Sequence, residues 1–280
     1  MDAKRTVLVA LSGTQSQGSI IQKAVAMASR LDAMLIFLHV IETPLFDYLD
    51  FKNVIDPISV KKKLSEEVAL YAAEVRTLVV VEFGTPSEVI VREAKRFEAM
   101  LIILGAKIYD PFAPHLGSTT KYILHHAPCS VNVIKNEKSY NDKVLVPVDI
   151  TGGNTKERGF EPFIQGFSKQ YLYVYEMPSE LSLQYHDLSN HHFDQWEENI
   201  RMEVIKQKSS FESASMRGGI ETVEVVSGIA NGISEYAANH AFHLIAFHSR
   251  NLHGMSSIIF GSVASNVAKI THADLLISYG

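Results

Sequence analysis

Apolar runs long enough for a strand recur along the chain, and each is followed by a stretch with helical spacing. The first run, Thr6–Leu11 (TVLVAL), is unbroken, which is typical of a strand buried on both faces of a parallel sheet. Apolar residues then recur three and four positions apart over 20–31, as on one face of an amphipathic helix. The same pattern predicts strands over 35–41, 78–83, 101–104 and 130–134, with helices over 58–77, 86–97 and 119–126 between them.

A recognisable helix start precedes residues 86–97. The segment Thr85-Pro86-Ser87-Glu88 has the spacing of a capping box, in which the Thr and Glu side chains satisfy the first N–H groups, and it places proline at the first helical position. Strand and helix alternate throughout residues 1–137. This alternation predicts an α/β fold, a doubly wound parallel five-stranded sheet with helices on both faces.

A second pass through the same pattern begins after a polar segment, KNEKSYND at 135–142, which is typical of a linker. The run VLVPVD at 144–149 repeats VLVALS at 7–12, with a separation of 137 residues. Further strands are expected over 171–175, 220–226, 243–247 and 275–278, and helices over 155–167, 193–216, 231–240 and 262–271.

Two copies of one α/β unit account for the whole chain, so we predict two domains, residues 1–137 and 138–280. The long helix over 193–216 is expected to pack its apolar residues into the core of the second domain. These residues are Trp196, Ile200, Val204 and Ile205.

Each copy contains one candidate anion site. Gly105 ends the fourth strand of the first copy, and Gly117-Ser118 opens the helix that follows. A buried strand, a glycine turn and a helix N-terminus together present backbone N–H groups that can hold an anion. The plan returns 144 residues later, where Gly261-Ser262 opens the last helix.

Composition narrows the classes of function. Of 280 residues, 46% are apolar and 20% charged, as in globular proteins. The net charge of −5 argues against a nucleic-acid partner, and the longest basic run, Lys61-Lys62-Lys63, is expected on a solvated helix face. The single cysteine, Cys129, excludes an internal disulfide, and no apolar run approaches the length of a membrane span. We therefore expect a cytoplasmic protein without a membrane or nucleic-acid partner.

Several segments resemble the universal stress protein family, here in tandem. The most specific is GSTTKYILHHAPCSVNVI at 117–134, and VLVPVD at 144–149 and the turn Gly84-Thr85-Pro86 add to it. The resemblance implies two doubly wound five-stranded sheets of the adenine nucleotide alpha hydrolase-like type, paired through their last strands. It also implies that the protein falls into either the ATP-binding or the non-binding group of that family.

The ATP-binding group has an Asp at the end of the first strand and a Gly-x2-Gly-x9-Gly-Ser/Thr loop after the fourth. The resemblance implies that the Asp accepts hydrogen bonds from ribose or adenine, or helps to hold a cation. It also implies that the glycines allow positive φ and a close approach to phosphates. In the first copy Ser12 occupies the Asp position. Gly105 is kept, but Ile108 replaces the second glycine and eight residues separate it from Gly117. We expect weak or no ATP binding there.

The second copy keeps more of the pattern. Asp149 is retained and the nine-residue gap before Gly261 is intact, although His248 and Asn251 replace the two glycines. Asn tolerates left-handed φ better than most residues. Here His248, Arg250 and His253 could bind an anion as cations, or they could be loop residues that simply fill space. ATP or AMP with Mg²⁺ is therefore expected, if at all, in the second domain. The candidate binding residues are Asp149, His248, Arg250, Asn251, Gly261 and Ser262, with Ser12, Gly105, Gly117 and Ser118 in the first domain.

Three further patterns are weaker. The segment SGTQS at 12–16 is similar to the Ser-Gly-Gly-x-Asp-Ser loop of pyrophosphate-releasing ATP enzymes, but it lacks the second Gly and the Asp. An ordinary turn is favoured. Cys129 with His125 and His126 could form a nucleophile pair, but Cys129 leads into an apolar strand and is expected to be buried and inert. One loop group matches no metal-ligand spacing and is expected to be solvated: His186, Asp187, His191, His192 and Asp194.

The leading hypothesis is a non-enzymatic stress-response binding or signalling protein, with no catalytic residue, no metal site and an unidentified protein partner. The alternative is an ATP or AMP sensor that uses the second domain only. Slow ATP hydrolysis has little support, because no general base and no carboxylate pair for a metal is visible. We expect the strands at Ser130–Ile134 and 275–278 to pair antiparallel as an internal pseudo-dimer, which removes two exposed edges. A homodimer of whole chains stays open.

Overall fold

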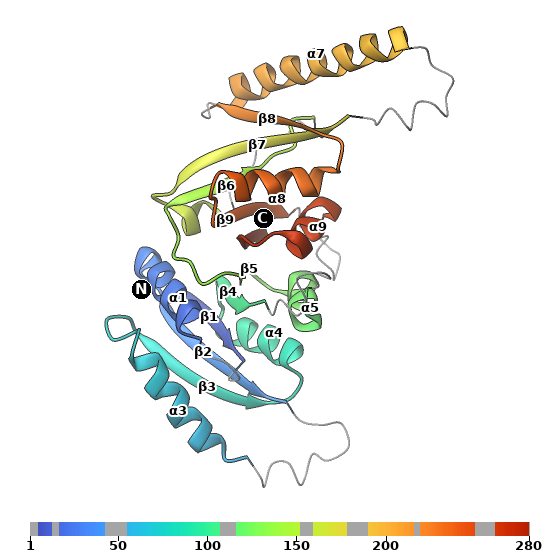
Figure 1. The fold of residues 1–280 in the computed structure, drawn as a ribbon. Helices are drawn as coiled ribbons and strands as arrows, with labels where there is room; N and C mark the ends of the chain where they lie inside the picture. Colours follow the sequence, from blue (N-terminus) through green and yellow to red (C-terminus); the bar gives the residue numbers. More distant parts are fainter. Residues whose placement is uncertain are drawn as a thin grey trace.

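The computed structural model of the chain describes residues 5–12, 17–42, 55–106, 116–151, 159–177, 190–215, 219–249 and 261–279. Its strands form one continuous sheet of ten strands in the order β3-β2-β1-β4-β5-β10-β9-β6-β7-β8 (Figure 1). The first half of the sheet contains β1 (Thr6–Leu11), β2 (Met34–Ile41), β3 (Thr77–Phe83), β4 (Leu101–Gly105) and β5 (Ser130–Ile134). The second half contains β6 (Lys143–Pro147), β7 (Ser168–Glu176), β8 (Ile220–Val225), β9 (Leu244–Ser249) and β10 (Asp274–Tyr279).

Helices cover both faces of this sheet, as the alternation of elements predicted. One buried cluster joins the sheet to α4 (Pro86–Arg96), α5 (Ser118–His126), α8 (Ile229–Asn239) and α9 (Ser262–Ile270). The other joins it to α1 (Gly18–Leu31), α3 (Pro57–Ala69), the 3₁₀ turn η1 (Glu161–Ile164) and α7 (Asn190–Ser215). Figure 1 shows β3 with α3 at one end of the sheet and β8 with α7 at the other.

The two halves join where β5 pairs antiparallel with β10, which confirms the predicted pseudo-dimer. Every other strand pair of the sheet is parallel. At the centre of the junction Asn132 lies opposite Leu276. These residues are 144 positions apart, the same separation as Gly117 and Gly261, so a pseudo-twofold axis passes between them.

A reciprocal pair of side chains holds each half to the last helix of the other. Lys135 Nζ donates to the Ala268 carbonyl of α9 at 2.6 Å, and Tyr279 Oη donates to the Leu124 carbonyl of α5 at 3.0 Å. Donor and acceptor residues are each related by 144 positions, so the two contacts are pseudo-symmetric. Burial lowers the pKa of Lys135 to about 8, although the nearby Asp274 opposes this effect.

A buried ion pair also crosses the junction, without a counterpart of the same chemistry. Lys23 Nζ of α1 lies 2.6 Å from Asp274 Oδ2 at the start of β10, and both side chains are buried. The other carboxylate oxygen accepts from the Lys135 main chain at 2.8 Å and from the Asn136 side chain at 2.9 Å. Burial raises the pKa of Asp274, and Lys23 acts in the opposite direction. The segment predicted as a linker therefore begins inside this junction.

Two helix predictions were wrong in length or type. The helix expected over 58–77 ends at Ala69, because Ala72 turns inward to the core and the Tyr71 hydroxyl packs against Gly18 of α1. The helix expected over 155–167 is a single 3₁₀ turn, η1, in its described part. Pro162 lacks an N–H group there, and Gly166 has φ +86°, so an α-helix cannot continue through both. Residues 152–158 lie outside the described part.

The predicted core face of α7 was only partly right. Val204 and Phe211 are buried, and Phe211 belongs to the core cluster on this face of the sheet. Trp196 is 42% exposed and Ile205 57% exposed, so neither is core. The reason is that α7 covers the edge strand β8. Arg201 of α7 donates to both carboxylate oxygens of Glu224 on β8. An edge position leaves much of the helix circumference in solvent.

Candidate functional site

A cavity of about 950 Å³ opens at the carboxyl ends of β1, β2 and β4 in the first half. The carboxyl ends of parallel strands meet at one edge of a sheet, and ligands of open α/β sheets bind at this edge. All four site residues predicted for the first copy line the cavity: Ser12, Gly105, Gly117 and Ser118. The structure therefore brings this predicted set together.

The wall of the cavity is partly apolar and partly polar. Ala10, Leu38 and Leu104 come from three neighbouring strands, while Ile20 and Ile90 come from α1 and α4 on opposite faces of the sheet. The strand positions follow from the unbroken apolar runs in the sequence. These residues can contact the apolar body of a ligand, and the serine, threonine and other polar residues of the lining can contact its polar groups.

Four helices begin at this cavity, and three of them lack a side-chain cap at the residue that precedes the helix. Gln17 precedes α1, Thr85 precedes α4 and Gly117 precedes α5, and no side chain of these residues caps the helix that follows. At α3, by contrast, Asp56 accepts from the main chain of Ile58 and Ser59. The side-chain bonds of the predicted capping box at Thr85 are thus absent, although proline does start α4. The N-terminus of α5 therefore leaves N–H groups and partial positive charge at the cavity. At α1 the Gln17 main chain already donates to Glu67 Oε1 at 3.2 Å.

Gln17 is the lining residue that sequence reasoning missed. Its side chain is 3% exposed, and its Oε1 accepts from the Ser12 main chain at 2.9 Å. Within the described part of the chain, its Nε2 has no hydrogen-bond partner. A buried donor without a partner is rare in native structures. The only available signal was its place just before a predicted helix, which by itself says nothing about burial.

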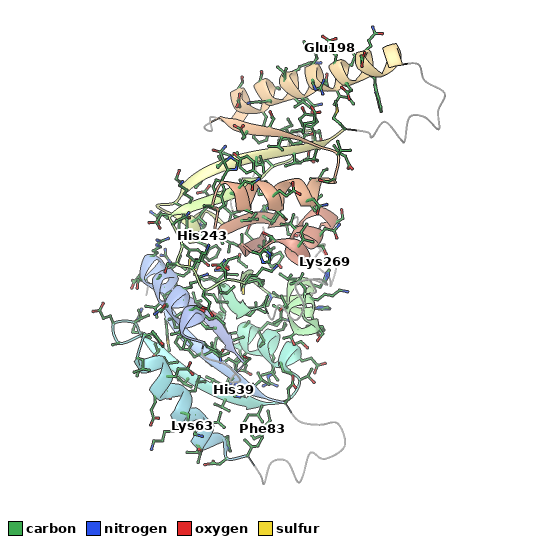
Figure 2. All side chains as sticks on the ribbon, in the orientation of Figure 1. His39, Lys63, Phe83, Glu198, His243 and Lys269 are labelled. Atoms are coloured by element: carbon green, nitrogen blue, oxygen red, sulfur yellow. The ribbon has the colours of Figure 1, made fainter. Side chains whose placement is uncertain are left out.

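Charged side chains contribute little to the described lining. Lys135 lines the cavity, but its Nζ is bound to the carbonyls of Ala268 and Thr271 at 2.6 and 2.7 Å. His39, labelled in Figure 2, lies on β2. Its Nδ1 is 2.9 Å from the Leu11 carbonyl oxygen. Glu42 is exposed. Among the described residues no group of three His, Cys, Asp or Glu side chains could hold a metal ion.

The motif glycines do not have the backbone role that the resemblance implied. Gly105, Gly117 and Gly261 are not among the described glycines with positive φ. Gly105 is required for space, since an added Cβ would lie 2.7 Å from Ile20 Cδ1. At Gly117 and Gly261 an added Cβ would meet nothing within 4 Å. These two positions therefore keep a helix N-terminus open and are not strained.

The strand register shows what has replaced the first glycine in the second half. Gly105 pairs with Ile134, and the corresponding pair is His248 with Ser278. His248 Nδ1 lies 3.1 Å from Ser278 Oγ, and Gly159 packs closely against both side chains. A side chain therefore stands at the position where, in the first half, Ile20 packs directly against Gly105.

The other second-half candidates are only partly described. Asp149 is exposed, and its Oδ1 accepts from the main chain and hydroxyl of Thr151 at 2.9 and 2.6 Å. Gly261 caps α9 with φ −55° and ψ 150°, and Ser262 begins that helix, in the same geometry as Gly117 and Ser118. Arg250, Asn251 and His253 lie outside the described residues. The loop that would bring the second set together is therefore not part of the described structure.

The remaining candidates do not form a site in the described residues. Cys129, which was predicted to be buried, is only partly buried, and desolvation there raises the pKa of its thiol to about 12. The His126 ring stacks on Tyr122 at 4.1 Å and places its Nδ1 at the Tyr122 carbonyl. Lys61 to Lys63 are exposed, as predicted, and Figure 2 shows Lys63 on the outer side of α3. Residues 13–16, His186, Asp187 and the side chains of His191 and His192 lie outside the described part.

Known proteins similar to this chain match it in sequence and in fold. A family model described as "Universal stress protein family" matches residues 4–135 and again 141–278. Universal stress protein A homolog 2 of Coxiella burnetii is 28% identical over 143 residues, which are 48% of this chain and 97% of that protein. A matched curated relative of this kind thus spans about half of the present chain.

Solved structures match nearly the whole chain. A functionally unknown protein from Pseudomonas aeruginosa PAO1 has a TM-score of 0.70 at 17% identity, over 99% of this chain and 93% of its own. A universal stress protein from Archaeoglobus fulgidus has a TM-score of 0.65 at 16% identity, over 98% of both chains. At these identities the similarity shows the fold alone. None of the described helices is long and apolar enough to cross a membrane. With two matches that cover most of its length, the chain belongs to the universal stress protein family.

Proposed function

We propose that this universal stress protein is a non-enzymatic, stress-response binding module whose ligand site is the first-half cavity. The observation that supports this proposal most directly is a cavity of ligand size at the strand ends. Ser12 lines this cavity at the position where the ATP-binding pattern has Asp. Cavities of roughly 300–1,000 Å³ with a few polar groups are typical of small-molecule sites. A cytoplasmic location belongs to the same proposal and rests on composition and on the single cysteine.

The residues present do not fit ATP with Mg²⁺ at this cavity. Phosphoryl transfer depends on a positioned metal and on cations that neutralise charge on the phosphates. The described lining offers one lysine, Lys135, whose ammonium group is already bound by α9 carbonyls. Among lining residues the described carboxylate is that of the exposed Glu42. This composition supports binding without hydrolysis, and signalling through protein partners whose identity is open.

Titration calorimetry of the full chain with ATP and AMP, with and without Mg²⁺, tests the proposal. We expect no binding of ATP–Mg²⁺ below millimolar concentration and no phosphate release above the blank. Micromolar ATP binding near one per chain that Gly117→Asp abolishes would overturn it, because Gly117 belongs to the first-half cavity.

A nucleotide sensor in the second half is the second candidate. It is supported by the retained Asp149, exposed after β6, and by Gly261, whose open side leaves room at the N-terminus of α9. If this site binds AMP or ATP, Asp149→Ala should abolish the affinity and Gly117→Asp should leave it unchanged. Nucleotide affinity that survives Asp149→Ala would exclude the second-half site.

A further inference from the structure

Lys135 lies where the first-half cavity meets the second half of the chain. It directly follows β5, lines the cavity and is partly buried. Its Nζ donates at 2.6 Å to the carbonyl of Ala268, in the last turn of α9, and at 2.7 Å to that of Thr271, which ends the helix. A lysine amine is thus held in place beside a cavity of ligand size.

The acceptors around Lys135 Nζ suit a neutral amine as well as an ammonium. An ammonium has three N–H donors, whereas a neutral amine has two donors and a lone pair. Two carbonyl oxygens satisfy both donors of the amine and leave its lone pair unengaged. The buried Lys23 differs, because its Nζ contacts the Asn136 carbonyl at 2.7 Å, Asn136 Oδ1 at 3.3 Å and Asp274 Oδ2 at 2.6 Å. That set matches all three donors of an ammonium and includes a carboxylate.

Burial also favours the neutral form of Lys135. Desolvation lowers the pKa of Lys135 from 10.5 to about 8, although Asp274 acts in the opposite direction. The Asp274 carboxylate is already paired with Lys23 at 2.6 Å. At pH 7.5 about a quarter of Lys135 is therefore unprotonated, against about one in a thousand for an ordinary lysine. A desolvated, neutral lysine amine is a nucleophile.

We propose that Lys135 is a site of covalent acylation, which accepts an activated acyl group carried by a phosphate or a thiol into the first-half cavity. The Lys135 nitrogen attacks the carbonyl carbon of the acyl group and forms an amide C–N bond with it. The bond from that carbon to the phosphate oxygen or thiol sulfur breaks, and the leaving group takes the electron pair and the proton of the amine. The proposal does not depend on which ligand the cavity binds reversibly.

Acylation changes the contact between the two halves. An amide nitrogen has one N–H and no charge, so one of the two carbonyls at the end of α9 loses its donor. A helix C-terminus carries partial negative charge, which an ammonium compensates and an amide does not. The pseudo-symmetric residue in the second half is Tyr279, whose hydroxyl donates to the Leu124 carbonyl, so the modification acts on one side of the junction only. Activated acyl groups therefore weaken the junction.

An exposed lysine on the same helix provides an internal control. Lys269 follows Ala268 on α9, and its side chain is exposed (Figure 2). The full chain is incubated at pH 7.5 with acetyl phosphate and, separately, with acetyl-coenzyme A, and peptide mass spectrometry follows both lysines with time. We expect acetylation of Lys135 to be about fivefold faster than that of Lys269 with at least one donor, which identifies the source of the acyl group. A rate at Lys135 no greater than that at Lys269 with both donors would overturn the proposal.

A pH series and a charge-preserving variant separate an activated amine from simple exposure. The acetylation rate at Lys135 should level off above about pH 9, whereas an ordinary lysine gains reactivity up to about pH 10. Identical pH profiles at the two lysines would contradict the proposal. Lys135→Arg keeps donors for both carbonyls and lacks the amine, so acetyl phosphate should lower the urea midpoint of the wild type more than that of Lys135→Arg. An equal loss in both chains would overturn the effect on the junction.

Discussion

Replacing Asp274 by Asn removes one charge from the junction between the two halves while keeping the shape of the side chain. In the wild-type chain Asp274 and Lys23 approach to 2.6 Å with side-chain exposures of 0% and 5%. The variant leaves the Lys23 ammonium buried without a counter-charge. It also leaves the Lys135 N–H and the Asn136 amide next to a group that can itself donate.

The size of the effect follows from this burial. Removing one partner of a buried ion pair destabilises a protein by about 3–5 kcal/mol, because the remaining charge stays out of water. A pair at the protein surface contributes only about 0–1 kcal/mol. The chain contains a matched surface pair, since Arg30 and Asp142 also lie 2.6 Å apart but are 35% and 64% exposed. Asp142→Asn makes the same chemical change there, and Asn tolerates the φ of +54° at this position.

Urea titrations of the wild type and of both variants, at one pH and one salt concentration, measure the two free-energy changes. Asp274→Asn should lower the free energy of unfolding by about 3–5 kcal/mol and Asp142→Asn by less than about 1 kcal/mol. Lys23→Met should fall at the lower end of the first range, because the carboxylate keeps three N–H donors from Lys135 and Asn136. Equal costs for the buried and the exposed pair would refute the reasoning that burial at the junction sets the energy.

Raising the pH from 8 to 10 should stabilise the wild type relative to Lys135→Met. Burial holds the pKa of Lys135 near 8 in the folded chain, against an ordinary value of 10.5, so the unfolded chain binds more protons between pH 8 and 10. Urea titrations of both proteins at the two pH values measure the change in the free energy of unfolding. The same change in the wild type and in Lys135→Met would contradict this prediction. On α7, Trp196→Ala should cost less than about 1 kcal/mol and Phe211→Ala about 3–5 kcal/mol by urea titration, because Phe211 is the residue in the core; equal costs would contradict this packing. Cys129 should react with a thiol reagent at pH 7.5 only after denaturant is added, since burial raises its pKa to about 12; fast labelling of the native chain would contradict that environment.

Much of the fold could be predicted because apolar runs report strands directly. The run Thr6–Leu11 became β1 with both bounds as predicted, and Ser130–Ile134 became β5. An unbroken apolar run of this length is typical of a parallel strand that is buried on both faces. The antiparallel pairing of β5 with β10 was implied by the family resemblance and could not come from the apolar pattern alone, because both edges of either strand look alike in sequence.

Helix ends and helix faces were less predictable, because tertiary packing decides them. Tyr71 and Ala72 continue the helical spacing of α3, yet contacts with α1 and the core end the helix at Ala69. Trp196 is a large apolar residue at a helix position that predicts burial, but α7 lies over an edge strand and leaves its side chain half exposed. The number of faces that an element buries depends on its place in the sheet, which local periodicity does not encode.

The sequence predicted which motif positions of the first copy lie together at the candidate site, but it did not predict the role of the glycines there. Ser12, Gly105 and Gly117 do meet at one cavity, since strand ends and helix starts are fixed by the topology. The reasoning from positive φ failed, because none of the described motif glycines has a positive φ. Gly105 is needed because Ile20 leaves no room for a Cβ, and Gly117 leaves the start of its helix open. Gln17 could not be found from the sequence, because an unpaired amide is a property of its surroundings in three dimensions.

Mass spectrometry of a denatured extract of the purified full-length chain tests the central claim most directly, since it identifies what the first-half cavity holds. The account predicts no stoichiometric ATP in the extract. Any small molecule that is released near one per chain should be missing from Gly117→Asp, purified in the same way. ATP recovered near one per chain from the wild type, and lost in Gly117→Asp, would contradict the account.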